Sequence, residues 1–173
     1  MIPLPPAYSV SDYDRTAAVA YAHKWAYGRN PAYYDFQNIG GDCTSFASQC
    51  LFAGSGVMNF TPIYGWYYRS LQDRAPAWSG VSYFYNFLTR NTGVGPFGID
   101  ADVTQVEPGD FVQLATIRPG FHHTPVIVRI EGAPSLRTIF VAAHTGDVDE
   151  RPLSTYPIQK LRFIHIEGVR HPL

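Results

Sequence analysis

Residues 40–51 read GGDCTSFASQCL, a run that joins a flexible turn to the start of a helix. Apolar side chains recur within it at a helical period, at positions 43, 46, 47, 50 and 51. The glycine pair permits a tight turn, and Asp42 is a favourable residue to cap a helix N-terminus. The pattern therefore predicts a helix that begins at Cys43 and stops near Gly54 and Gly56.

Cys43 has two interpretations at that position. A thiol in the first turn lies among unpaired N–H groups at the positive end of the helix, which lowers its pKa and favours the nucleophilic thiolate. Free cysteine is also among the most buried residue types, and Cys43 shares a helix face with Phe46 and Cys50. Spacing alone favours a core cysteine, so a nucleophile requires partners elsewhere in the chain.

Composition narrows the class of protein. The 173 residues suit one domain, residues 1–173, and a formal net charge of −1 predicts binding to neither nucleic acid nor an anionic membrane. No apolar run reaches the roughly 18 residues of a membrane span. If Cys43 and Cys50 share one helix, they lie about 10 Å apart along its axis, too far for a disulfide. No CxxC pair predicts a zinc site, and we expect no metal and no cofactor.

The first six residues lack the charged and apolar regions of a signal peptide. We expect either an intracellular protein or a domain of a longer exported protein, which would act outside the cell or at the cell wall. The residues do not distinguish the two, and they leave the oligomeric state open.

Helical and alternating patterns divide the chain near Pro108. Helices are expected over residues 12–27, where Ser11 and Asp14 form a capping pair, from 43 to about 54, and from about 79. Residues 1–10 are expected as an extended lead-in and 92–98 as a glycine-rich loop. Strands are expected over 111–117, 124–130, 138–144 and 161–166, with a hairpin at Gly132 and Pro134. Helices followed by an antiparallel sheet indicate an α+β fold.

Histidines at the ends of two expected strands are candidate partners for the thiol. His122 and His123 begin one strand and His144 ends the next, and these ends are neighbours in an antiparallel hairpin. A cysteine nucleophile needs a base, and the base needs an orienting group, for which Asp147 is a second candidate. The alternative is that these histidines terminate strands at the surface. A metal site formed by His122, His123, His144 and Asp147 is disfavoured. His122 and His123 are adjacent, and adjacent residues of a strand face opposite sides.

With these motifs in place, the chain resembles the putative amidase domain family, papain-like cysteine peptidases related to bacterial cell-wall hydrolases of the CHAP and NlpC types. The similarity covers most of the chain. The matching blocks are YDR at 13–15, AAVAYA at 17–22, NPAY at 30–33, GDCTSF at 41–46, SQCL at 48–51, WYY at 66–68, WSGV at 78–81, GD at 109–110, HT at 123–124, VIV at 126–128, AHTGD at 143–147 and PL at 152–153. The family usually has asparagine where Ser45 stands.

The resemblance implies that Cys43 is the nucleophile and His123 the base. His144, chosen over Asp147, is implied as the group that orients the base. The doubled His122-His123 leaves the register open by one residue, and such a slip reverses the strand face. His123 is preferred because it places the following apolar pair as the family has it. Pro125 implies an edge or a bulge in that strand.

Further site residues follow from a papain-like mechanism. The oxyanion would be held by the Cys43 backbone N–H and one side-chain donor, for which Gln37 is the candidate. Exposed rings offer flat faces for sugars, so the aromatic residues of the middle segment are candidates to line the cleft, with core packing as the alternative. These are Trp66, Tyr67, Tyr68 and Trp78.

The implied function is cysteine-dependent hydrolysis of an amide bond. The family points to peptidoglycan as substrate, at either a stem-peptide bond or the sugar–peptide amide. A peptidase or acyltransferase that acts on protein or small amides would use the same residues. A non-catalytic papain-like binding module is the rival from another class, and the intact set of Cys43, His123 and His144 argues against it.

Overall fold

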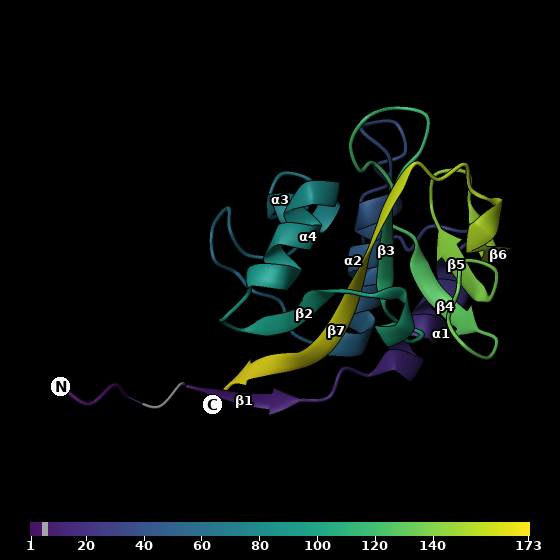
Figure 1. Ribbon diagram of the computed structural model, residues 1–173. Helices are drawn as coiled ribbons and strands as arrows, with labels where there is room; N and C mark the ends of the chain where they lie inside the picture. Colours follow the sequence, from purple (N-terminus) through teal and green to yellow (C-terminus); the bar gives the residue numbers. More distant parts are fainter. Residues whose placement is uncertain (5–6) are drawn as a thin grey trace.

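The computed structural model describes residues 1–4 and 7–173, and Figure 1 shows it as a ribbon. The helices are α1 (Arg15–Trp25), α2 (Cys43–Ser55), α3 (Pro76–Ser79) and α4 (Val81–Arg90), with short 3-10 turns η1 (Val103–Gln105) and η2 (Leu153–Thr155). The strands are β1 (Tyr8–Ser11), β2 (Gly95–Ala101), β3 (Phe111–Ala115), β4 (Val126–Ile130), β5 (Ile139–Ala143), β6 (Val148–Pro152) and β7 (Lys160–Pro172). The predicted α+β class is confirmed.

All strand pairs of the sheet are antiparallel. Its order is β1-β7-β3-β4-β5-β6, and β2 pairs with β7 as well. The predicted hairpin at Gly132 and Pro134 joins β4 to β5 and is confirmed. Pro125 lies just before β4, where its missing N–H costs no ladder bond. Since β4 has a neighbour on each side, the edge alternative for Pro125 is wrong, and a bulge lies further along, between Ile127 and Arg129.

Helix α2 is the centre of the packing. It lies behind β3 and β7 in Figure 1, and Phe46, Ala47, Cys50 and Leu51 on it are fully buried. They form one core cluster with sheet residues such as Phe111. Burying a side chain of this size is worth roughly 1.5–3 kcal/mol, so the sheet fixes the position of the helix and of the cysteine at its start.

Helix α1 and the segment 92–98 differ from prediction. Helix α1 begins only at Arg15, because Asp14 caps it by accepting from the N–H of Ala17 at 2.9 Å, while Ser11 belongs to β1. The expected loop 92–98 instead leads into β2, which pairs with β7. A Cβ on Gly98 would lie 2.3 Å from the carbonyl oxygen of His165, so a glycine is needed for this close pairing. None of the helices in the described part of the chain is long and apolar enough to cross a membrane.

Candidate active site

Cys43 is the first residue of α2, as predicted, and it is also buried, with 5% of its surface exposed. Gly40 and Gly41 make the turn before it with φ angles of 91° and 95°, a region that residues with a side chain rarely adopt. Both descriptions of this cysteine therefore hold at once: it starts the helix, and it contributes to the packing. Cys43 and Cys50 are both free thiols.

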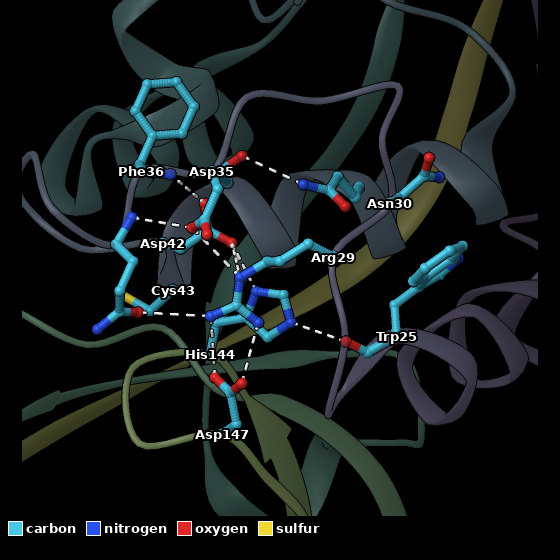
Figure 2. Close-up of polar contacts among 12 residues, drawn as sticks. Trp25, Arg29, Asn30, Asp35, Phe36, Asp42, Cys43, His144 and Asp147 are labelled. Carbon is cyan, nitrogen blue, oxygen red and sulfur yellow. Dashed lines mark hydrogen bonds and ion pairs between the residues drawn. The ribbon is translucent and has the colours of Figure 1, made fainter.

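Asp42 occupies the capping position, but its side chain makes no capping bond to the helix, which corrects the predicted role. The carboxylate turns back instead. Its Oδ1 accepts from the N–H of Phe36 at 2.8 Å, and its Oδ2 accepts from Nδ1 of His144 at 2.5 Å (Figure 2). The Asp42 side chain thus leaves the first N–H groups of α2 to other partners, and such groups form a natural site for negative charge.

The sulfur of Cys43 lies against the backbone of residues 122–124. It is 3.8 Å from the carbonyl oxygen of His122 and 3.8 Å from Oγ1 of Thr44, and the N–H of Thr124 points at it. Burial raises the pKa of the Cys43 thiol, opposed in part by hydrogen bonds from Thr124 and Thr44. The lowered pKa expected from the helix start is therefore wrong, and the resting group is a thiol that needs a base.

His123 lies between the two peptide groups that the sulfur contacts. It is buried, with 6% exposed, and its ring centroid is 5.7 Å from that of Tyr156. Desolvation, with smaller contributions from the charges of His122 and Arg151, lowers the pKa of His123 to about 4. The ring is neutral at pH 7 and can accept a proton.

Tyr156 is a member of this cluster that the sequence did not indicate. Burial raises the pKa of its hydroxyl, and the guanidinium of Arg151 opposes this in part. Its ring also packs beneath the guanidinium of Arg151, 3.6 Å away. No motif or periodicity in the segment after η2 marks Tyr156 as a site residue.

The ring of His122 is engaged elsewhere. Its Nε2 accepts from the backbone N–H of Thr116 at 3.1 Å and lies 2.9 Å from the Thr116 hydroxyl. Among the hydrogen bonds of the described residues, none joins the Cys43 sulfur to the ring of either His122 or His123. The structure therefore places His123 beside the nucleophile candidate through its backbone, and holds the His122 side chain in the preceding loop.

His144 contacts α2 rather than His123. It is 1% exposed, stacks on Phe46 with centroids 3.9 Å apart, and donates from Nε2 to the carbonyl of Trp25 at 2.8 Å, as well as from Nδ1 to Asp42. A ring that donates from both nitrogens is positively charged, and the Asp42 carboxylate balances it. The carbonyl of Trp25 ends α1, where helix geometry also favours a cation.

The strand register explains why His144 and His123 do not meet. Val126 pairs with Ala142, so position 144 continues opposite 124 rather than 123. Thr124 faces α2, as its 2.9 Å hydroxyl contact with Thr44 shows, and His144 faces α2 through Phe46. The ring of His123 instead lies beside Tyr156, with centroids 5.7 Å apart, and no hydrogen bond among the described residues joins it to His144.

Asp147 is occupied by an arginine that sequence reasoning missed. Its two oxygens accept from Nη1 and Nη2 of Arg29 at 3.0 and 3.1 Å (Figure 2). Arg29 also lies 3.2 Å from Asp35 and 3.8 Å from Asp42. This ion network fixes the loop before Cys43 from the side of β5 and β6.

Gln37 belongs to the same loop and is exposed. Its backbone N–H donates to Oδ1 of Asp35 at 3.0 Å, and its Oε1 lies 3.5 Å from Nη2 of Arg29. With the amide oxygen directed to the arginine, the NH₂ group is left as a donor.

The aromatic candidates divide between core and surface. Trp66 and Trp78 are fully buried and stack with centroids 5.1 Å apart, and Trp66 donates to the Ser48 hydroxyl at 3.0 Å. Trp66 and Trp78 are therefore core residues, which is the alternative to lining a cleft. Tyr68 packs on Trp78 at 5.7 Å, whereas Tyr67 is partly exposed. Within residues 1–4 and 7–173, no group of three or more His, Cys, Asp or Glu is arranged to hold a metal ion.

Comparisons with known proteins support the family. The family model described as "Putative amidase domain" matches residues 12–166. The chain is also 32% identical over 120 residues to "Uncharacterized protein YhbB" of Bacillus subtilis (strain 168), covering 67% of this chain and 37% of that protein. It therefore spans little more than a third of that relative's length. No solved structure matches. Because the family model covers most of its length, this chain belongs to the putative amidase domain family.

Proposed function

We propose that the protein is a cysteine-dependent amide hydrolase with a papain-like site, in which Cys43 is the nucleophile and His123 the base. One observation carries the proposal: the Cys43 sulfur, at the start of α2, packs against the two peptide groups that flank a buried His123. Family membership supports the reaction class, since an amide bond is what an amidase cleaves.

The protonation states suit a stepwise reaction from a neutral pair. His123 would take the thiol proton as the sulfur attacks the carbonyl carbon, and would then give that proton to the leaving amine. The products of this half-reaction are an amine and a thioester at Cys43. Water, deprotonated by the same ring, would hydrolyse the thioester and restore the thiol.

The developing oxyanion needs donors that are already in place. The backbone N–H of Cys43 supports this role, because the Asp42 side chain does not bind it. The side-chain NH₂ of Gln37 is the second candidate, since its oxygen faces Arg29. In this proposal the ion network of Arg29 holds the loop so that Gln37 is presented to the substrate.

We propose peptidoglycan as the source of the amide, at a stem-peptide bond or the sugar–peptide amide. This choice comes from the resemblance to CHAP and NlpC-type hydrolases, and the same residues would serve a peptidase or acyltransferase that acts on other amides. The rival from another class is a binding module that has kept the fold. The separation of His144 from His123 is the observation that favours this rival, because it leaves the base without the predicted orienting group.

Selective alkylation of the cysteines distinguishes the hydrolase from a non-catalytic binding module. With iodoacetamide, Cys43 should react faster than Cys50, and His123→Gln should slow the reaction at Cys43 if the ring activates the thiol. Cys50 lies in the same helix and is fully buried, so its labelling reports unfolding. The native protein should also release fragments from purified peptidoglycan, and Cys43→Ala should not. Equal labelling of the two cysteines, or full release by Cys43→Ala, would contradict the proposal.

A further inference from the structure

A hollow remote from Cys43 lies between α4 and the segment that follows α2. Its volume is about 520 Å³. The lining that matters here consists of Ile63, Tyr64, Tyr83, Asn86, Phe87 and Arg90, which we call the α4 pocket. Helix α2 has 13 residues and so rises about 20 Å from Cys43 to the end that leads into this segment. A volume of several hundred Å³ is typical of ligand sites.

The walls of the α4 pocket are tied together by side-chain amides. Nδ2 of Asn59, on one wall, donates at 2.9 Å to the carbonyl of Val94, the residue after Gly93 of the other wall. Nδ2 of Asn91 donates to the same carbonyl at 3.1 Å and to that of Pro96 at 3.0 Å. These bonds set the pocket before any ligand arrives, so binding does not have to order the loops.

The lip of the pocket holds exposed apolar residues in a tight turn. Ile63 has a φ angle of 67°, which is a strained conformation for a β-branched residue. The turn is closed by a hydrogen bond from the N–H of Gly65 to the carbonyl of Thr61 at 2.9 Å. Tyr64 is 83% and Tyr83 60% exposed, so two flat rings stand at the opening. Strain of this kind is often found at ligand clamps.

The chemistry of the lining matches a sugar. The floor is apolar, with Phe87 buried in it, and no carboxylate is among the lining residues. In the described part of the chain, the side chains of Asn86 and Arg90 have no hydrogen-bond or ion-pair partner in the protein. Flat rings above an apolar floor suit the C–H face of a pyranose, while an amide and a guanidinium suit its hydroxyl and acetamido groups.

A second hollow adjoins the α4 pocket. It measures about 360 Å³ and shares Tyr83 with the first. Arg74 on its lining lies over the ring of Phe36, 4.5 Å from the centroid. The N–H of Phe36 binds Asp42, the residue before Cys43. Arg74 therefore links the second hollow, through the buried ring of Phe36, to the packing of the loop before Cys43.

We propose that the α4 pocket binds acetamido sugars of a glycan strand and so holds a polymeric substrate against α4. The choice of polymer rests on the proposed function, but the site itself does not involve Cys43. Substrate recognition would thus extend well beyond the amide that is cleaved, over α4 and the segment after α2.

The test is binding without hydrolysis. The full chain carrying Cys43→Ala is titrated calorimetrically with tetra-N-acetylglucosamine, with peptide-free glycan strands and with soluble stem peptide. Binding of both saccharides is expected, and Tyr83→Ala or Tyr64→Ala should each weaken it roughly three- to tenfold, the effect of losing one ring contact. Tyr27→Ala is the matched control, since Tyr27 is 70% exposed and its hydroxyl accepts from the backbone N–H of Asp149 in β6.

Each outcome bears on the pocket alone. No saccharide binding, unchanged affinity in both tyrosine variants with unaltered circular dichroism, or stem-peptide binding that these variants abolish would overturn the proposal. Hydrolysis by the unmodified protein is assayed separately. Saccharide binding without hydrolysis would support the glycan site and contradict the proposed hydrolase. Hydrolysis without saccharide binding would support the hydrolase and contradict the glycan site.

Discussion

Burial of His123 should make the stability of the protein depend on pH in a way that one substitution removes. Desolvation lowers its pKa from 6.5 to about 4 in the folded protein. Between these values the unfolded chain binds the proton and the folded chain does not, so protonation favours unfolding. The folded state therefore has its full stability above pH 6.5 and loses it as the pH falls toward 4.

The size of this loss follows from the shift. Each pKa unit corresponds to about 1.4 kcal/mol, so His123 alone should lower the free energy of unfolding by roughly 2 to 3 kcal/mol between pH 7 and pH 4.5. That is a large part of the 5–15 kcal/mol typical of a domain. His123→Gln cannot be protonated and should lack this loss, although carboxylates will still contribute their own pH dependence to both proteins.

Urea unfolding at pH 7, 5.5 and 4.5 measures the effect. The quantity of interest is the difference between wild type and His123→Gln in the free energy of unfolding, which should change by about 2 kcal/mol or more across this range in favour of the variant. His171→Gln, in the last strand, controls for removal of a histidine. A difference that is constant with pH would show that His123 is hydrated and protonated like a free histidine, and the argument from burial would fail.

Three other outcomes are expected. His123→Ala should lower the rate of amide hydrolysis by two or more orders of magnitude, while His122→Ala should have a small effect. The acid limb of the wild-type pH–rate profile should lie near pH 4. A larger loss of rate in His122→Ala than in His123→Ala would assign the base to His122. His144→Ala should lower the free energy of unfolding by about 3–5 kcal/mol, because it leaves the buried carboxylate of Asp42 without its partner, and the acid limb of the pH–rate profile of any remaining activity should not move. A shifted acid limb with unchanged stability would instead support His144 as the group that orients the base. Gln37→Ala should lower kcat about 100-fold with little change in KM, as for loss of one oxyanion donor, and an unchanged kcat would remove Gln37 from the site.

Local signals predicted the parts of the fold that local interactions determine. The bounds of α2 follow from a glycine turn before Cys43 and from Gly56, which takes the left-handed conformation that ends the helix. Strands that depend on a distant partner were missed. Gly95–Ala101 becomes β2 only because β7 is long enough to pair with it, and Val148–Pro152, which reads VDERP, carries charges in place of alternating apolar residues.

The candidate site shows the same division. Cys43 at the helix start and a histidine next to it were accessible from motif and spacing. The partner of His144 could not be predicted in this way. It depends on whether residue 123 or residue 124 lies opposite residue 144, and a shift of one residue in the register reverses the face. Tyr156 reaches the site through tertiary packing, and the segment that contains it has no pattern of its own.

The two buried histidines have opposite surroundings. His144 donates from both nitrogens to oxygen acceptors, so its charge is compensated where it lies, and it fixes the turn before Cys43 between the end of α1 and the start of α2. No carboxylate among the described residues compensates a charge on His123, which lies near Tyr156 and the positive charge of Arg151, so burial keeps the ring neutral. A charged ring cannot accept the thiol proton, whereas a neutral one can. In the proposed mechanism these two rings would therefore separate positioning from proton transfer: the His144–Asp42 pair would fix the turn before Cys43, and the uncharged His123 would be the group that removes the thiol proton.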